Sequence, residues 1–369
     1  MNYLSKLCRT TQPYVAGEQP QDKKYVKLNT NESPYPPCKG VEEFVKNFDV
    51  DRLKLYPDPQ NTALAEAIAK KHGLKKENVF IGNGSDEVLA MCFPTFFDRD
   101  GDGVAYADVT YSFYKVWANA YEIPSVVIPL SEDFKVDVSG FKQAKCQGMI
   151  ICNPNAPTGL IVNRLDLISI IEANPEKLII IDEAYADFCN CSMANYVSKY
   201  PNLLIVRTFS KSYSLAGARC GYAIGDATLI SGLKTIKDSF NSYTVNALTE
   251  GIAVRALKDT GYFNSCVDKI IATRDATADE LRGLGFEVLQ SSTNFLFAKH
   301  CERPASEIYY QLKKSGVLVR HFSTRRINNY LRITVGSPEE MEKLVATLKK
   351  ILSRSPLTRK KNREEFRQN

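Results

Sequence analysis

Residues 203–221 read LLIVRTFSKSYSLAGARCG, and this stretch decides the fold. Its first part, residues 203–208, is rich in Leu, Ile and Val, as is typical of a buried strand. Lys211 follows among small and hydroxyl side chains that include Ser210, and Arg219 comes eight residues later between small residues. A lysine used for covalent chemistry must lose its proton, and an apolar site at the mouth of a sheet favours this. A solvated Lys and Arg in a surface loop are the alternative.

The sequence around this stretch alternates between strand-like and helix-like segments. We expect strands at residues 78–82, 104–107, 126–129, 148–152, 178–181 and 203–208, and helices at 61–72, 86–97 and 112–120. Apolar strands separated by helices favour an α/β fold, with a mostly parallel central sheet flanked by helices. This is predicted to be a large domain covering residues 34–261.

The pattern changes after residue 261 to a smaller α+β domain. Here we expect helices at residues 262–284, 305–315 and 338–352 and strands at 286–290, 295–298, 318–320 and 330–335. The last helix begins with a cap-like Ser337-Pro338-Glu339-Glu340 sequence. Residues 1–33 are expected to form an N-terminal arm associated with this domain, which runs from 262 to 353.

Composition excludes several classes of protein. Of 369 residues, 44% are hydrophobic and 24% charged, which excludes disorder, collagen and coiled coil as the dominant character. No uncharged apolar run is long enough to span a membrane. The net charge is +6, but residues 354–369 hold six basic and two acidic side chains. The rest of the chain is therefore close to neutral, and a basic stripe for nucleic acid is not indicated. We expect the basic tail to be mobile.

The ten cysteines are scattered, and only Cys189 and Cys191 are close together. The chain has no CxxC pair and no His at a ligand-like spacing from a Cys pair, so no metal site is predicted. Reduced thiols, together with an N-terminus that does not resemble a signal peptide, predict a cytoplasmic protein.

Three further segments place polar groups at the ends of predicted strands. In IIIDEAYADF (residues 179–188), Asp182 ends an apolar strand, where α/β proteins bind ligands, and Tyr185 follows closely. Such a carboxylate is suited to pair with a pyridinium N–H, although a helix N-cap is equally compatible. NPNAPTG (residues 153–159) predicts a sharp turn. NGSDE (residues 83–87) opens a helix whose N–H groups suit a phosphate, or is a plain capping turn.

With KLNTNESPYPP (residues 27–37), LYPDP (55–59) and YLRITVGS (330–337), these segments stand in a recognisable order. From about residue 14 to residue 352, the chain resembles the fold-type I pyridoxal-phosphate aminotransferases of class I and II. Within them it is most similar to the histidinol-phosphate aminotransferases.

The resemblance implies pyridoxal 5′-phosphate as cofactor and a role for each matching residue. Lys211 would form the internal aldimine, Asp182 would pair with the pyridine nitrogen, and Tyr185 would hydrogen-bond the 3′-oxygen. Tyr111 would stack on the ring. The cofactor phosphate would be held by Gly84, Ser85, Asp86, Thr208, Ser210 and Arg219, and the substrates by Tyr14, Asn31, Tyr56, Arg320 and Arg332.

The resemblance also implies transamination between histidinol phosphate and 2-oxoglutarate in histidine biosynthesis. It implies a homodimer in which Tyr56 reaches the neighbouring active site. Threonine-phosphate decarboxylases and broad-range aromatic aminotransferases share the main motifs and remain alternatives. One position departs from the family pattern NNPTG, because Ala156 stands where an asparagine usually holds the cofactor 3′-oxygen. Either Asn155 shifts into that role or Tyr185 holds the oxygen alone.

Overall fold

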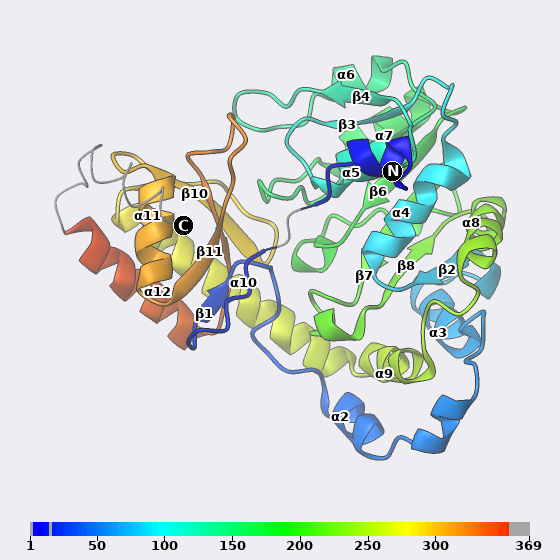
Figure 1. The fold of residues 1–369 in the computed structure, drawn as a ribbon, viewed down its shortest axis with the longest axis horizontal. Helices are drawn as coiled ribbons and strands as arrows, with labels where there is room; N and C mark the ends of the chain where they lie inside the picture. The colour runs from blue at the N-terminus through cyan, green and yellow to red at the C-terminus, as the bar shows by residue number, and fades with distance from the viewer. Residues whose placement is uncertain (1–2, 15–16, 354–369) are drawn as a thin grey trace.

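The computed structural model describes residues 3–14 and 17–353. The prediction of a mobile basic tail concerns residues 354–369, which lie outside the described residues. Among the helices that are described, none combines the length and apolar character needed to cross a membrane. Two separate sheets, each covered by helices, make up the described chain (Figure 1).

The larger sheet has seven strands in the order β2-β8-β7-β6-β5-β3-β4. Six strands run in one direction and β8 runs against both of its neighbours, so the prediction of a mostly parallel α/β sheet is confirmed. The strands are β2 (Val79–Gly82), β3 (Val104–Ala107), β4 (Ser125–Ile128), β5 (Gly148–Cys152), β6 (Leu178–Asp182), β7 (Leu203–Thr208) and β8 (Gly221–Ile224).

The apolar runs of the central strands are buried on both faces because helices cover both sides of the sheet. Along β6, Ile179 and Ile181 point to one core and Ile180 to the other, as the two-residue period of a strand requires. The first face carries α3 (Thr62–His72), α6 (Val138–Gln143), α7 (Arg164–Ala173) and α9 (Ala247–Lys258). The second carries α4 (Ser85–Phe96), α5 (Phe113–Ala120) and α8 (Ala227–Phe240).

The smaller sheet has five strands in the order β1-β11-β12-β10-β9, antiparallel except for the β1–β11 pair. Its strands are β1 (Val26–Leu28), β9 (Phe286–Val288), β10 (Phe295–His300), β11 (Val317–His321) and β12 (Leu331–Thr334). Helices α10 (Thr260–Gly283), α11 (Ala305–Lys314) and α12 (Pro338–Leu352) pack on it. Ser337 caps α12 in a capping box with Glu340, as the sequence predicted. The long helix α10 runs from α9 to the smaller sheet and so links the two parts (Figure 1).

Two short helices, α1 (Lys6–Thr10) and α2 (Lys39–Lys46), complete the α-helices of the described residues, and five 3₁₀ turns lie at Val50–Lys54, Lys76–Asn78, Ala186–Phe188, Ala194–Tyr196 and Ala216–Ala218.

The expectation that the cysteines are reduced is wrong at one pair. The sulfurs of Cys189 and Cys191 are bonded, with their Cα atoms 5.5 Å apart, whereas the other eight are free. The backbone at Cys189 is extended, and in extended backbone side chains two residues apart point to the same side. The side chain of Cys191 therefore lies on the same side as that of Cys189.

Candidate active site

A cavity of about 600 Å³ opens at the carboxyl ends of β5, β6 and β7 and is closed on its other side by residues of the smaller sheet. Parallel strands bring their carboxyl ends to one edge, so residues distant in sequence meet there. The predicted site residues that line it are Tyr14, Asn31, Ser85, Asp86, Tyr111, Asp182, Tyr185, Thr208, Ser210, Lys211, Arg219, Arg320 and Arg332. Gly84 lies directly behind Arg219, and Tyr56 lies outside the cavity.

The amine of Lys211 faces the cavity from the loop that follows β7. Its Nζ donates a hydrogen bond of 3.3 Å to the carbonyl of Thr30. Burial, and then the nearby charge of Arg332, lower the pKa of Lys211 to about 8. A substantial fraction of the amine is therefore neutral and nucleophilic near neutral pH.

Asp182, the last residue of β6, is 3% exposed and faces the same cavity. Burial raises its pKa to about 6, while hydrogen bonds from the Tyr114 hydroxyl (2.6 Å to Oδ2) and the Ala184 amide (3.1 Å to Oδ1) lower it. A buried carboxylate without a cationic partner is unfavourable, and a ligand that presents a protonated ring nitrogen compensates it.

The phenol of Tyr185 accepts a 2.8 Å hydrogen bond from Asn31 Nδ2. Asn31 is itself fixed, because Thr334 Oγ1 bonds both its backbone amide and its side-chain oxygen. Burial raises the pKa of Tyr185 to about 12, so the group stays a neutral hydroxyl.

Ala156 stands where the family pattern has an asparagine, and the structure shows where the neighbouring Asn155 lies. Asn155 does not line the cavity, whereas Ala156 does. The Asn155 amide donates to the Val109 carbonyl and to Thr158 Oγ1, and its oxygen accepts from Thr110. These contacts use the polar atoms of Asn155 outside the cavity, whereas Tyr185 and its partner Asn31 line the cavity.

A second polar region lies at the start of α4. Gly84 has φ +91°, and a Cβ added there would lie 2.6 Å from a guanidinium nitrogen of Arg219. A Cβ at Gly221 would lie 2.3 Å from the amide nitrogen of Ser85. The two glycines thus allow the α4 N-terminus and Arg219 to approach each other, and such a concave cationic surface suits a phosphate. Asp86 contacts Arg219 at 3.4 Å and accepts from the Tyr111 hydroxyl at 2.8 Å.

The far wall of the cavity contains two arginines from the smaller sheet. Arg332 Nη2 donates to the Asn29 carbonyl at 3.0 Å, while its buried Nε has no hydrogen-bond partner in the described structure. Burial lowers the pKa of Arg332, and the charge of Arg320 adds to this. An unpaired buried donor next to a second guanidinium is the arrangement that an anionic ligand satisfies.

Tyr14 stacks on Phe113 at the cavity wall, with ring centroids 4.2 Å apart. The lining groups that the sequence reasoning missed include Gln19, Asn29, Thr30 and Glu32, and it also missed Tyr114, which bonds Asp182. Tyr114 lies in the first turn of α5, three residues after Tyr111, and this closeness to a predicted site residue is a signal that could have revealed it.

Comparison with known proteins agrees with this geometry. Residues 23–348 match the family model described as aminotransferase class I and II. A histidinol-phosphate aminotransferase of Clostridium botulinum (strain Okra / Type B1) is 47% identical over 352 residues, covering 95% of this chain and 99% of the relative. One from Marinomonas sp. (strain MWYL1) is 49% identical over 339 residues, covering 91% and 96%.

A similar fold is found in the histidinol-phosphate aminotransferase of Sinorhizobium meliloti, solved in complex with pyridoxal-5′-phosphate. The TM-score is 0.86 at 24% identity, with 95% of this chain and 98% of that chain covered. The family match spans most of the sequence and both sheets. The chain belongs to the class I and II aminotransferases.

Proposed function

We propose that the protein transfers an amino group between histidinol phosphate and 2-oxoglutarate, with pyridoxal 5′-phosphate as cofactor, as a step of histidine biosynthesis. The observation that carries the proposal is a single cavity in which Lys211, Asp182 and two arginines face one another. The near-half identity to histidinol-phosphate aminotransferases over almost the whole chain supports this choice of substrate.

The residues of the cavity fit the cofactor. Asp182 is a buried carboxylate in need of a cationic partner, and the Gly84 and Gly221 cradle leaves room for a phosphate beside Arg219. When bound, the cofactor supplies an electron sink for breaking a bond next to the substrate nitrogen. Asp182 would keep the proton on the ring nitrogen, and Tyr185 would hydrogen-bond the ring oxygen.

Lys211 has two tasks in this proposal. Its neutral Nζ would bind the cofactor before substrate arrives. Once displaced, the same nitrogen would take the proton from the substrate α-carbon and deliver it to the cofactor carbon on the other side of the shared nitrogen. The lowered pKa of about 8 suits both tasks, because the amine accepts and gives up a proton near neutral pH.

The substrate pocket must accept two anions in turn, the carboxylate of the amino donor and the phosphate ester of histidinol phosphate. Arg332 would take the carboxylate, and Arg320 with Tyr14 would surround the phosphate. The guanidinium fork fits both anions, so one pocket can serve both halves of the reaction.

The test is glutamate-dependent turnover of imidazole acetol phosphate by purified protein supplied with pyridoxal phosphate, with Lys211→Ala as the inactive control. Borohydride reduction followed by peptide mapping should attach the cofactor to Lys211. Release of CO2 from threonine phosphate would show a threonine-phosphate decarboxylase instead. Faster turnover of aromatic amino acids would show a broad-range aromatic aminotransferase. An unlabelled Lys211 would overturn the assignment of the site.

We further propose a cytoplasmic homodimer in which Tyr56 completes the neighbouring cavity. In its own chain Tyr56 is 81% exposed and stacks on Tyr243 with centroids 4.6 Å apart. The apolar side chains of Val50, Leu53 and Leu55 beside it are also largely exposed. An exposed apolar segment of this kind is typical of a protein interface.

A further inference from the structure

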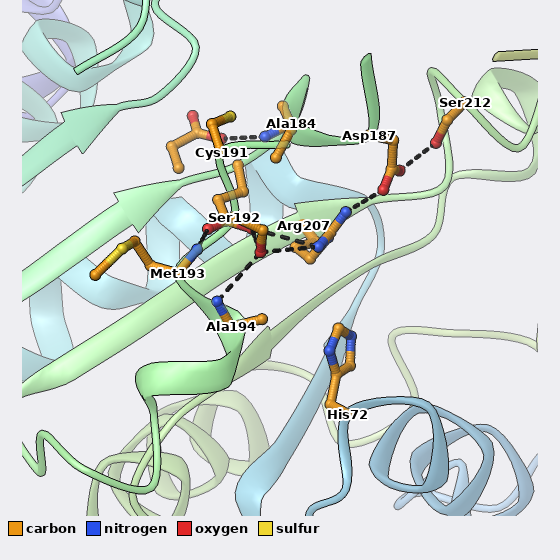
Figure 2. A network of polar contacts seen from close by, with 12 residues as sticks. His72, Ala184, Asp187, Cys191, Ser192, Met193, Ala194, Arg207 and Ser212 are labelled. Carbon is orange, nitrogen blue, oxygen red and sulfur yellow. Dashed lines mark hydrogen bonds and ion pairs between the residues drawn. The ribbon is translucent and has the colours of Figure 1, made fainter. Parts of the chain in front are cut away.

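A buried ionic network lies behind the cavity and contacts neither the cavity nor any predicted substrate group. The Arg207 network consists of Arg207, Glu183, Asp187, Ser192 and Ser212 (Figure 2). The guanidinium of Arg207, on β7, bonds Glu183 Oε2 at 3.3 Å with one nitrogen and Asp187 Oδ1 with the other. Ser192 donates to Glu183 at 2.7 Å, and Ser212 donates to the second oxygen of Asp187.

The network is rigid for a physical reason. Arg207 is 7% exposed and Glu183 2% exposed, so each charge depends on the others for compensation. Glu183 is further fixed by the Met193 amide, 2.6 Å from its second oxygen. Buried charges with satisfied hydrogen bonds have few alternative arrangements, because any displacement leaves a group unpaired.

Two of its members are direct sequence neighbours of the residues assigned to the cofactor. Glu183 follows Asp182, and Ser212 follows Lys211. Asp182 and Lys211 come from the ends of different strands, β6 and β7, so the backbone alone does not fix the distance between their side chains. The chain of contacts from Glu183 through Arg207 and Asp187 to Ser212 joins the two loops.

We propose that the Arg207 network is a positioning device that holds Lys211 at a fixed distance from Asp182, with the Ser212–Asp187 hydrogen bond as its link to the lysine loop. This inference rests on the proposed roles of Lys211 and Asp182. Ser212 and Asp187 are positioning residues in it, since they act on the cofactor only through Lys211.

The matched pair Ser212→Ala and Ser192→Ala tests the proposal. Each variant removes one hydroxyl that donates to a carboxylate of the network, but only Ser212 adjoins Lys211. The Ser192 hydroxyl also accepts from Arg207 at 3.4 Å, so its loss removes at least as many contacts of the network. Ser212→Thr, which keeps the hydroxyl, is the rescue variant. Two quantities are measured: the pH midpoint of Lys211 acetylation in the cofactor-free protein, and the dissociation constant of pyridoxal phosphate. Thermal unfolding of each cofactor-free variant reports folding separately.

The charged groups that face Lys211 are Arg332, Arg219, Asp86, Glu32 and Asp182, and both variants keep all of them. On the far side of the network, burial and then the charge of Arg207 lower the pKa of His72 to about 4, so this side chain stays neutral during the titration. A change in the Lys211 midpoint therefore reports a change in its position.

In Ser212→Ala, the freed loop should let Lys211 move toward water, raising the midpoint by about half a pH unit or more and weakening pyridoxal phosphate about fivefold. Ser192→Ala should match the wild type in both quantities, and Ser212→Thr should restore them. Equal values in the two alanine variants, whether both normal or both altered, would overturn the positioning role. A wild-type protein that binds no cofactor at Lys211 would overturn the proposed function as well.

Discussion

Arg320 and Arg332 are direct cross-strand partners in the antiparallel β11–β12 pair, and both face the cavity. Like charges opposite each other on neighbouring strands are destabilising. The two arginines nevertheless lie side by side in the wall of the cavity, and the buried Nε of Arg332 has no hydrogen-bond partner in the described structure. An anion bound at the unbonded Nε of Arg332 would also reduce the repulsion between the two guanidinium groups.

Separate removal of the two guanidinium groups should therefore affect the two half-reactions differently. Arg332→Met should weaken glutamate turnover, and Arg320→Met that of histidinol phosphate, each by about a hundredfold in kcat/KM because a charge-assisted contact is lost. Half-reactions followed by cofactor absorbance distinguish the effects. Equal losses with both substrates in both variants would contradict the division of roles.

The lowered pKa of Lys211 predicts a pH dependence of cofactor capture. Because the protonated amine is not a nucleophile, the association rate of pyridoxal phosphate should fall about tenfold per pH unit below the midpoint and level off above it. The midpoint should lie near the pKa of about 8, which burial and Arg332 produce. Stopped-flow absorbance across this range measures it.

Replacement of Arg332 by Met removes one of the positive charges that lower this pKa, so the midpoint should move to higher pH. Arg326→Met is the matched control, since Arg326 pairs with Asp108 and does not line the cavity. A midpoint that stays at the same pH in Arg332→Met would show that the charge of Arg332 does not contribute to the lowered pKa of Lys211.

The sequence predicted those strands and site residues whose position is determined by their immediate neighbours in the chain. Strands β3, β5 and β7 have the predicted bounds, because their apolar runs end at polar or turn residues. Lys211 and Asp182 were recognised from their neighbours and lie at the predicted strand ends. Strand β8 was not predicted, and its antiparallel pairing with both neighbours leaves no local pattern in the sequence.

Side-chain partners were the harder part of the prediction. Whether Asn155 reaches the cavity depends on Val109 and Thr110, which lie on another loop, so position in the motif did not decide it. The Tyr114 contact with Asp182 likewise joins α5 to β6 across the core. Such contacts follow from the packing of distant segments, which periodicity does not describe.

Gly84→Ala should weaken the cofactor beyond its effect on folding. Gly84 has φ +91°, and the new Cβ would collide with Arg219, displacing the guanidinium from the phosphate cradle. Gly73→Ala is the matched control, because Gly73 also has positive φ (+64°) but open space around its Cβ position. Gly73→Ala should lose about 1 kcal/mol of folding stability. Gly84→Ala should lose about 1–3 kcal/mol, because its φ of +91° and ψ of 161° are adopted almost only by glycine. Only Gly84→Ala should bind pyridoxal phosphate about tenfold or more weakly, as measured by fluorescence titration. Similar affinities in the two variants would contradict the proposal that Arg219 and the start of α4 bind the cofactor phosphate.

Mixing two inactive variants tests whether Tyr56 serves the neighbouring subunit. Lys211→Ala lacks the essential amine, and Tyr56→Ala lacks the phenol that lies outside the cavity of its own chain. In a mixed dimer, one cavity would combine an intact Lys211 with an intact Tyr56 from the other chain. Random reassortment of equal amounts should therefore restore about one quarter of the wild-type sites. Activity is measured after dissociation and reassembly, with size-exclusion chromatography to establish the dimer. A mixture no more active than the separate variants would place Tyr56 in a structural role.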